Sequence, residues 1–152
     1  MTDSIFKTWD ANRKILATFL DNYSVEQLNK IPAGFSNNMM WNIGHIIAAQ
    51  QGLVYRLSGL EMYIQGEFYE RYKPGSKPDT TAGEAEVDVV RLYLNALVDK
   101  TKADYDAGKF VTFTERMTAT GFHLGSLNDA LVFNNYHEGL HLGVMMSIRK
   151  FV

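Results

Sequence analysis

Four long segments with a helical pattern of apolar residues are the feature that most limits how this chain folds. Apolar side chains recur three and four positions apart in residues 4–22, 38–58, 83–106 and 126–149, which places them along one face of an α-helix. Helices with one apolar face must bury that face against other elements. The pattern therefore predicts an all-α fold in which four helices pack as a four-helix bundle.

Residues that start or stop helices stand at the ends of these segments. Ser126 is placed to cap the fourth helix, with Asp129 three positions later. Gly108 follows the third segment and would end that helix. Ser24 precedes polar helix-forming residues, which predicts one short helical turn at residues 24–28.

The connection between the second and third helices is long. Residues 61–81 contain Pro74 and Pro78, which interrupt regular structure, and several aromatic residues. We therefore expect a long crossover connection that packs on the bundle through its aromatic side chains. Residues 110–114 alternate like a strand but have no evident partner, so an extended loop is predicted there. A single domain over residues 1–152 accounts for the whole chain.

Composition excludes several classes of protein. The chain has 152 residues, a net charge of −2 and no Cys. The charge balance is not that of a nucleic-acid binder, and the absence of Cys excludes disulfides and thiolate metal sites. No stretch reaches the roughly 18 apolar residues of a membrane span, and the first residues do not resemble a signal peptide. We therefore expect a cytoplasmic protein that binds neither nucleic acid nor a membrane.

Two histidines on the predicted fourth helix are spaced to bind one metal ion. His137 and His141 are four positions apart, so they lie on one helix face. That face is mostly apolar, and buried imidazoles need either a metal or hydrogen-bond partners. Both alternatives are open. With Glu138 the pair also matches H-E-x-x-H, the zinc-protease helix, but residues 142–152 contain no third ligand.

His45 is the candidate third ligand. It lies near the start of the second predicted helix, beside Gly44, and a glycine in a helix makes sense if another element packs closely there. Opposite the pair in a bundle, His45 would complete a three-imidazole site suited to Zn, Ni, Cu or Fe. Three His ligands with one open position are typical of catalytic rather than structural zinc sites.

Polar residues near these histidines are candidates to support the site. Asn42, Asn134 and Glu138 each lie within one helical turn of a candidate ligand, where a side chain can accept the second ring N–H of a histidine. Glu138 has two further interpretations, a catalytic general base and a solvated carboxylate. The fourth histidine, His123, lies in a loop and is predicted to be a surface residue.

Several short sequences occur in a distinctive order. They are WNIGH at residues 41–45, SLNDAL at residues 126–131, HEGLHLG at residues 137–143 and the Pro-containing loop at residues 28–38. Their order and spacing resemble the DinB-like (DinB/YfiT) metalloenzyme superfamily over nearly the whole chain. The resemblance implies a four-helix bundle and no DNA binding, despite the family name.

The resemblance also implies a site and a range of activities. By matching position, His45, His137 and His141 would hold a divalent metal ion, most often zinc or nickel in this family. Relatives commonly form homodimers, and some are transferases or isomerases that use a low-molecular-weight thiol. We therefore expect a metal-dependent S-transferase, isomerase or hydrolase that acts on a small molecule. Neither the substrate nor the cofactor-binding residues follow from the sequence. The alternatives are a non-catalytic metal-binding or sensing protein and a structural bundle with buried histidines.

Overall fold

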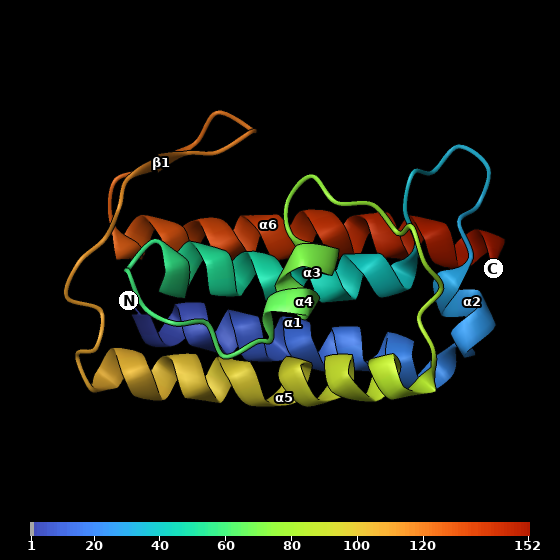
Figure 1. The fold of residues 1–152 in the computed structure, drawn as a ribbon, viewed down its shortest axis with the longest axis horizontal. Coiled ribbons are helices and arrows are strands. Elements are labelled where there is room, and N and C mark those ends of the chain that lie inside the picture. Colours follow the sequence, from blue (N-terminus) through green and yellow to red (C-terminus); the bar gives the residue numbers. More distant parts are fainter. Residues whose placement is uncertain (1) are drawn as a thin grey trace.

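The four segments with helical periodicity form the four long helices of the computed structural model, which describes residues 2–152 (Figure 1). Together with two short helices and one small sheet, they give an all-α fold, as the sequence predicted. The long helices are α1 (Thr2–Asn22), α3 (Met39–Gln51), α5 (Glu84–Asp106) and α6 (Leu127–Ile148).

The long helices lie side by side along most of the molecule. α1 packs against α5 and α6, and α3 packs against the same two helices. Figure 1 shows that α1 and α6 run in one direction and that α3 and α5 run in the opposite one. Because α3 and α5 are parallel, the chain must return along the molecule between them, and residues 57–83 make this crossover.

The crossover contains a short helix that the sequence did not predict. α4 (Gly66–Tyr72) lies within residues 61–81, which were predicted only as a connection. Seven residues are too few to show a helical period. Phe68 and Tyr72 of α4 are buried, and α4 packs against α3. The predicted packing of this segment is therefore confirmed, but its helical form was missed.

Capping residues set the ends of several helices. The Ser24 side chain accepts from the backbone N–H of Gln27 and starts α2 (Val25–Asn29). Ser126 accepts from the backbone N–H of Asp129 and starts α6 in the same way. The cap at Ser126 and the short helical turn after Ser24 were both predicted from the sequence.

The second predicted helix, residues 38–58, differs most from the structure. It is α3 followed by one π-helical turn, η1 (Gly52–Arg56). A π turn shifts the side chains that follow it relative to a regular helix, and periodicity cannot locate it in advance. At the end of the chain, a 3₁₀ turn, η2 (Arg149–Phe151), continues α6.

A small hairpin precedes α6. Strand β1 (Arg116–Met117) pairs antiparallel with β2 (His123–Leu124). Two-residue strands leave no alternation to detect, so the sequence did not predict them. Residues 110–114 form an extended loop, as predicted.

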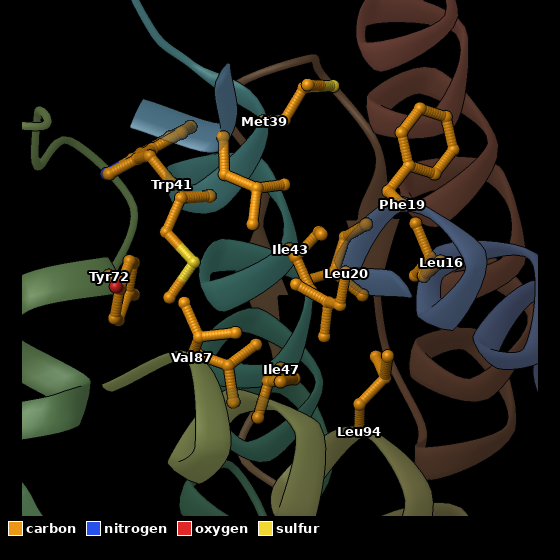
Figure 2. Close-up of a cluster of buried hydrophobic side chains, with 14 of the residues drawn as sticks. Leu16, Phe19, Leu20, Met39, Trp41, Ile43, Ile47, Tyr72, Val87 and Leu94 are labelled. Atoms are coloured by element: carbon orange, nitrogen blue, oxygen red, sulfur yellow. The ribbon is translucent and has the colours of Figure 1, made fainter. Parts of the chain in front are cut away.

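The core surrounds α3, whose thirteen residues are all buried. Figure 2 shows side chains of α1, α4 and α5 meeting those of α3. The apolar residues of the first predicted helix are buried, except that Ile15 is 44% exposed. Leu16, Phe19 and Leu20 pack in this core, and Ile5 and Trp9 pack in a second cluster. A helix buried on every side has no solvent face for polar residues, so each polar side chain of α3 must find a partner inside the protein. Among residues 2–152, no helix has both the length and the apolar character needed to cross a membrane.

Candidate metal centre

Three histidines from two helices meet at one point, as the sequence predicted. His45 comes from α3, and His137 and His141 come from α6. Their ligand nitrogens all lie within 4.8 Å of one another, and the Nε2 atoms of His45 and His137 are 3.1 Å apart. Two imidazole nitrogens on one tetrahedral zinc ion lie about 3.3 Å apart. The cluster therefore needs only small side-chain shifts to hold one ion.

The orientation of His45 depends on a glycine. Its Nδ1 donates to the backbone carbonyl of Tyr72 over 2.8 Å, which leaves its Nε2 lone pair facing the other histidines. Tyr72 can come this close because Gly44 has no side chain. A Cβ added at Gly44 would lie 2.4 Å from Cδ1 of Tyr72. The close packing predicted from Gly44 is therefore confirmed, and α4 is the element that packs there.

His141 is oriented by the side chain of Asn42. Its Nδ1 donates to Oδ1 of Asn42 over 2.7 Å. The amide nitrogen of Asn42 donates in turn to Oδ1 of Asn37 and to the carbonyl of Asn38, which fixes which end of the amide faces the histidine. Asn42 thus has the supporting contact that the sequence predicted for it, and Nε2 of His141 keeps its lone pair.

His137 is the least supported of the three. Its Nδ1 is buried and has no hydrogen-bond partner among residues 2–152. Asn134, one turn earlier, does not serve it, because its amide nitrogen donates to Glu138 over 2.8 Å and its Oδ1 is also without a partner. The lone pairs of His45 and His137 would face each other at 3.1 Å unless a proton or a cation lay between them.

Burial favours the neutral form of all three imidazoles. Burial, and to a smaller extent the neighbouring histidines, lowers the pKa of His137 to about 2. Burial and the nearby His45 lower the pKa of His141 to about 3. Burial also lowers the pKa of His45, although its bond to Tyr72 acts in the opposite direction. Neutral imidazoles have the free lone pair that a metal ligand requires.

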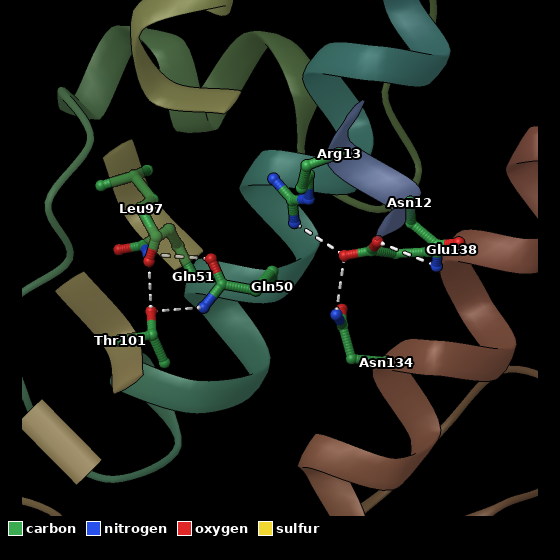
Figure 3. A network of polar contacts seen from close by, with 8 residues as sticks. All are labelled: Asn12, Arg13, Gln50, Gln51, Leu97, Thr101, Asn134 and Glu138. Atoms are coloured by element: carbon green, nitrogen blue, oxygen red, sulfur yellow. Dashed lines mark hydrogen bonds and ion pairs between the residues drawn. The ribbon is translucent and has the colours of Figure 1, made fainter. Parts of the chain in front are cut away.

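Glu138 points into a different network from the histidines beside it (Figure 3). Its carboxylate forms a 2.7 Å ion pair with Arg13 of α1 and also accepts from Asn134 and Asn12. Glu138 is only 1% exposed, which excludes the interpretation as a solvated carboxylate. Arg13 could not be predicted from the sequence, because its partner lies 125 positions away.

His123 is exposed and lies outside the cluster. Its Nε2 contacts a carboxylate oxygen of Glu115 at 2.9 Å, and it is not among the grouped ligands. Its predicted surface position is confirmed.

A cavity of about 380 Å³ opens above the three histidines. Its walls come from α3, η1, α4, the β1–β2 hairpin and α6. Trp41 stacks on the ring of His45 at a centroid distance of 4.6 Å and forms part of one wall. Arg56 and Arg116 also line the cavity; sequence reasoning missed both, because neither belongs to a recognisable motif.

Comparison with known families agrees with this geometry. The family model described as DinB superfamily matches residues 8–145, which include His45, His137 and His141. Among curated proteins, no match to this chain was found.

Proposed function

We propose that this chain, which belongs to the DinB superfamily, is a metal-dependent enzyme whose His45, His137 and His141 bind one divalent ion. The observation that carries this proposal is the convergence of three neutral imidazoles at the base of a cavity. Two of the rings have their Nδ1 atoms engaged, so their Nε2 atoms are the ones available to a metal. This arrangement is typical of catalytic metal sites with an open position.

Zinc and nickel are the ions that we propose, because imidazole ligands suit both. A divalent ion in such a site supplies Lewis-acid chemistry and lowers the pKa of a water or thiol that reaches it. A low-molecular-weight thiol is a proposed co-substrate, consistent with a chain that has no Cys of its own. The rest of the site orients the ligands and shapes the cavity.

Catalysis is favoured over simple metal storage by the cavity. A volume of about 380 Å³ lies within the range of small-molecule sites. A buried storage or structural site would have no use for an opening of this size next to its ligands. We therefore propose transfer, isomerisation or hydrolysis of a small molecule in this cavity, with a non-catalytic metal-binding protein as the alternative that an activity screen would reveal.

For Glu138 we propose a positioning role. Its carboxylate accepts hydrogen bonds from Arg13, Asn12 and Asn134, so neighbours on α1 and α6 engage three of its roughly four lone pairs. A general base needs a free lone pair within reach of the proton it removes. Residual activity of a Glu138→Gln variant, which keeps the shape of the side chain, would distinguish the two roles.

We also propose that residues 1–152 form one four-helix bundle domain that assembles as a homodimer. The pairwise contacts of α1, α3, α5 and α6 support the bundle. An exposed stripe on α6 supports the dimer: Val132, Tyr136 and Met146 are each 45–49% exposed, and Gly139 and Gly143 between them leave the backbone accessible. The molar mass in solution, measured by light scattering, tests the dimer.

Metal analysis tests the proposed site. Purified wild-type protein, stripped and reloaded with Zn²⁺ or Ni²⁺, should bind about one ion per chain. The variants His45→Ala and His141→Ala should lose most of this metal, and His123→Ala is the matched control that should retain it. Less than about 0.2 ions per chain in the wild type, unchanged by His141→Ala, would contradict the three-histidine site.

An activity screen then tests catalysis. Electrophilic small molecules and simple esters are offered to metal-loaded protein with and without glutathione, bacillithiol or mycothiol. Turnover that His45→Ala abolishes and His123→Ala retains would support the enzyme. Full metal occupancy without turnover in any combination would favour the metal-binding alternative.

A further inference from the structure

The geometry points to an organic anion as the molecule that the cavity accepts, with its acidic group bound by Arg56 and Arg116. This inference rests on the proposed function for the reacting end of the molecule, which would face the three histidines. The acidic group itself is recognised by the arginines alone. Carboxylate and phosphate share the oxyanion chemistry that a guanidinium binds.

The charged residues of the cavity wall are all positive. Two arginines line it, and no Asp, Glu or Lys does. In the part of the chain that the structure describes, neither Arg56 nor Arg116 forms an ion pair, whereas Arg13, Arg71 and Arg91 each have a carboxylate partner. A cavity lined by cations without counter-charges concentrates anions.

Arg56 is held in place from one side. Its Nη1 donates to the hydroxyl of Tyr69 over 3.1 Å, and its guanidinium carbon lies 5.5 Å from the centre of the Tyr69 ring. A guanidinium has five N–H donors, so this contact leaves most of them available. Tyr69 also lines the cavity. Arg56 is therefore oriented at the wall rather than spread freely into solvent.

Arg116 approaches from the hairpin. It lies on β1, opposite Leu124 of β2. The adjacent acidic residue, Glu115, contacts His123, and successive side chains in an extended chain point to opposite sides. The one carboxylate next to Arg116 in sequence thus has a partner elsewhere, and Arg116 is an exposed residue of the cavity wall without an ion pair among residues 2–152.

The remaining wall is largely apolar and aromatic. Trp41, Leu53 and Phe133 form part of it, and planar rings pack well on such surfaces. The cavity therefore fits a small acid with an apolar body, whose acidic group contacts the arginines while its other end approaches the histidines.

Binding of matched probes tests this inference. Phenylacetate, phenyl phosphate and the neutral phenylacetamide are titrated into metal-loaded wild-type protein by calorimetry or ligand-observed NMR. We expect at least one of the two anions to bind about tenfold more tightly than the amide, because charge-assisted hydrogen bonds are about twice as strong as neutral ones. The preferred anion identifies the headgroup. Raising the salt concentration should weaken its binding, because screening reduces electrostatic attraction at exposed sites.

Charge-removing variants locate the binding site. Arg56→Gln and Arg116→Gln should each weaken binding of the preferred anion by about tenfold. Arg149→Gln removes an exposed arginine outside the cavity wall and should leave the binding unchanged. Arg56→Lys keeps the positive charge but not the forked set of guanidinium N–H donors. Its affinity for the anion should fall between those of the wild type and Arg56→Gln. Circular dichroism confirms that each variant is folded.

Two results would overturn the inference: amide binding as tight as that of both anions, or wild-type affinity in both Arg56→Gln and Arg116→Gln. Metal analysis and anion titration, carried out on the same protein samples, separate the two proposals. If the protein binds a full complement of metal but shows no preference for anions, the anion site alone is refuted. Retained, arginine-dependent selectivity in a protein that binds no metal refutes the metal site alone.

Discussion

Replacing Gly44 by alanine should weaken metal binding without touching any ligand. The new Cβ would lie 2.4, 2.5 and 2.7 Å from three atoms of the Tyr72 ring. The ring cannot simply swing away, because it is 2% exposed and its hydroxyl donates to Glu86 over 2.5 Å. Carbon atoms in contact need about 3.5 Å, so α4 must move outward by about 1 Å.

That movement acts on His45. The bond from His45 to the Tyr72 carbonyl is now 2.8 Å, and an added ångström takes it beyond hydrogen-bond range. Loss of a contact that orients a ligand typically lowers metal affinity by about 10- to 100-fold. Strain costs about 1–3 kcal/mol, and the better helix propensity of alanine offsets about 1 kcal/mol of it.

Competition with a chelator measures the effect. The affinity of Gly44→Ala for Zn²⁺ is compared with that of the wild type and of Gly66→Ala, a glycine of α4 whose added Cβ meets no neighbour within 4 Å. Gly66→Ala should keep the metal affinity and gain up to about 1 kcal/mol of stability. Wild-type affinity in Gly44→Ala, within about twofold, would refute the argument that Tyr72 orients a metal ligand.

Three further outcomes follow from the same contacts. Asn42→Ala removes the acceptor for His141 and should lower metal affinity by about 10- to 100-fold in the same chelator assay, whereas the exposed Asn95→Ala should not. Arg13→Met strands the buried Glu138 carboxylate and should cost about 3–5 kcal/mol in urea unfolding; the double variant Arg13→Met/Glu138→Met should cost less, and an equal or larger loss would contradict a buried ion pair. Metal-free protein should lose stability as the pH falls below about 6.5, since unfolded histidines take up protons there while the folded pKa values are about 2 for His137 and about 3 for His141. Each of these histidines contributes up to about 1.4 kcal/mol per pH unit, so His141→Ala should flatten the dependence and a flat wild-type curve would contradict the burial.

The sequence predicted the long helices because their pattern is local, and it missed elements that depend on contacts between distant residues. α4 is the clearest example. Its seven residues show no period, and it is held where Tyr72 reaches Gly44, 28 positions earlier in the chain. Gly44 itself indicated that some element packs closely there, but nothing in the sequence identified the element.

The same distinction between local and distant contacts applies to the candidate site. The spacing of His137 and His141 and the position of Asn42 could be predicted, because helical geometry relates each to its neighbours. The contact of Asn134 with Glu138 was not predicted. Both His137 and Glu138 lie within one helical turn of Asn134, and the sequence does not show which of them its amide contacts. Arg13, Arg56 and Arg116 lie on three different elements, and only the folded chain shows which of them has a carboxylate partner.

The fully buried helix α3 explains why the site is where it is. Four of its polar side chains, Asn42, His45, Gln50 and Gln51, are enclosed. Gln50 donates to Thr101 of α5, and Gln51 accepts from the backbone N–H of Tyr63. At this end of α3 protein groups satisfy the polar atoms, whereas at the other end Nε2 of His45 faces Nε2 of His137. A single N–H of His137 can satisfy that contact, but it engages only two of the three rings. One metal ion would engage a lone pair of each of the three imidazoles, which is the physical basis for expecting a metal at this end of α3.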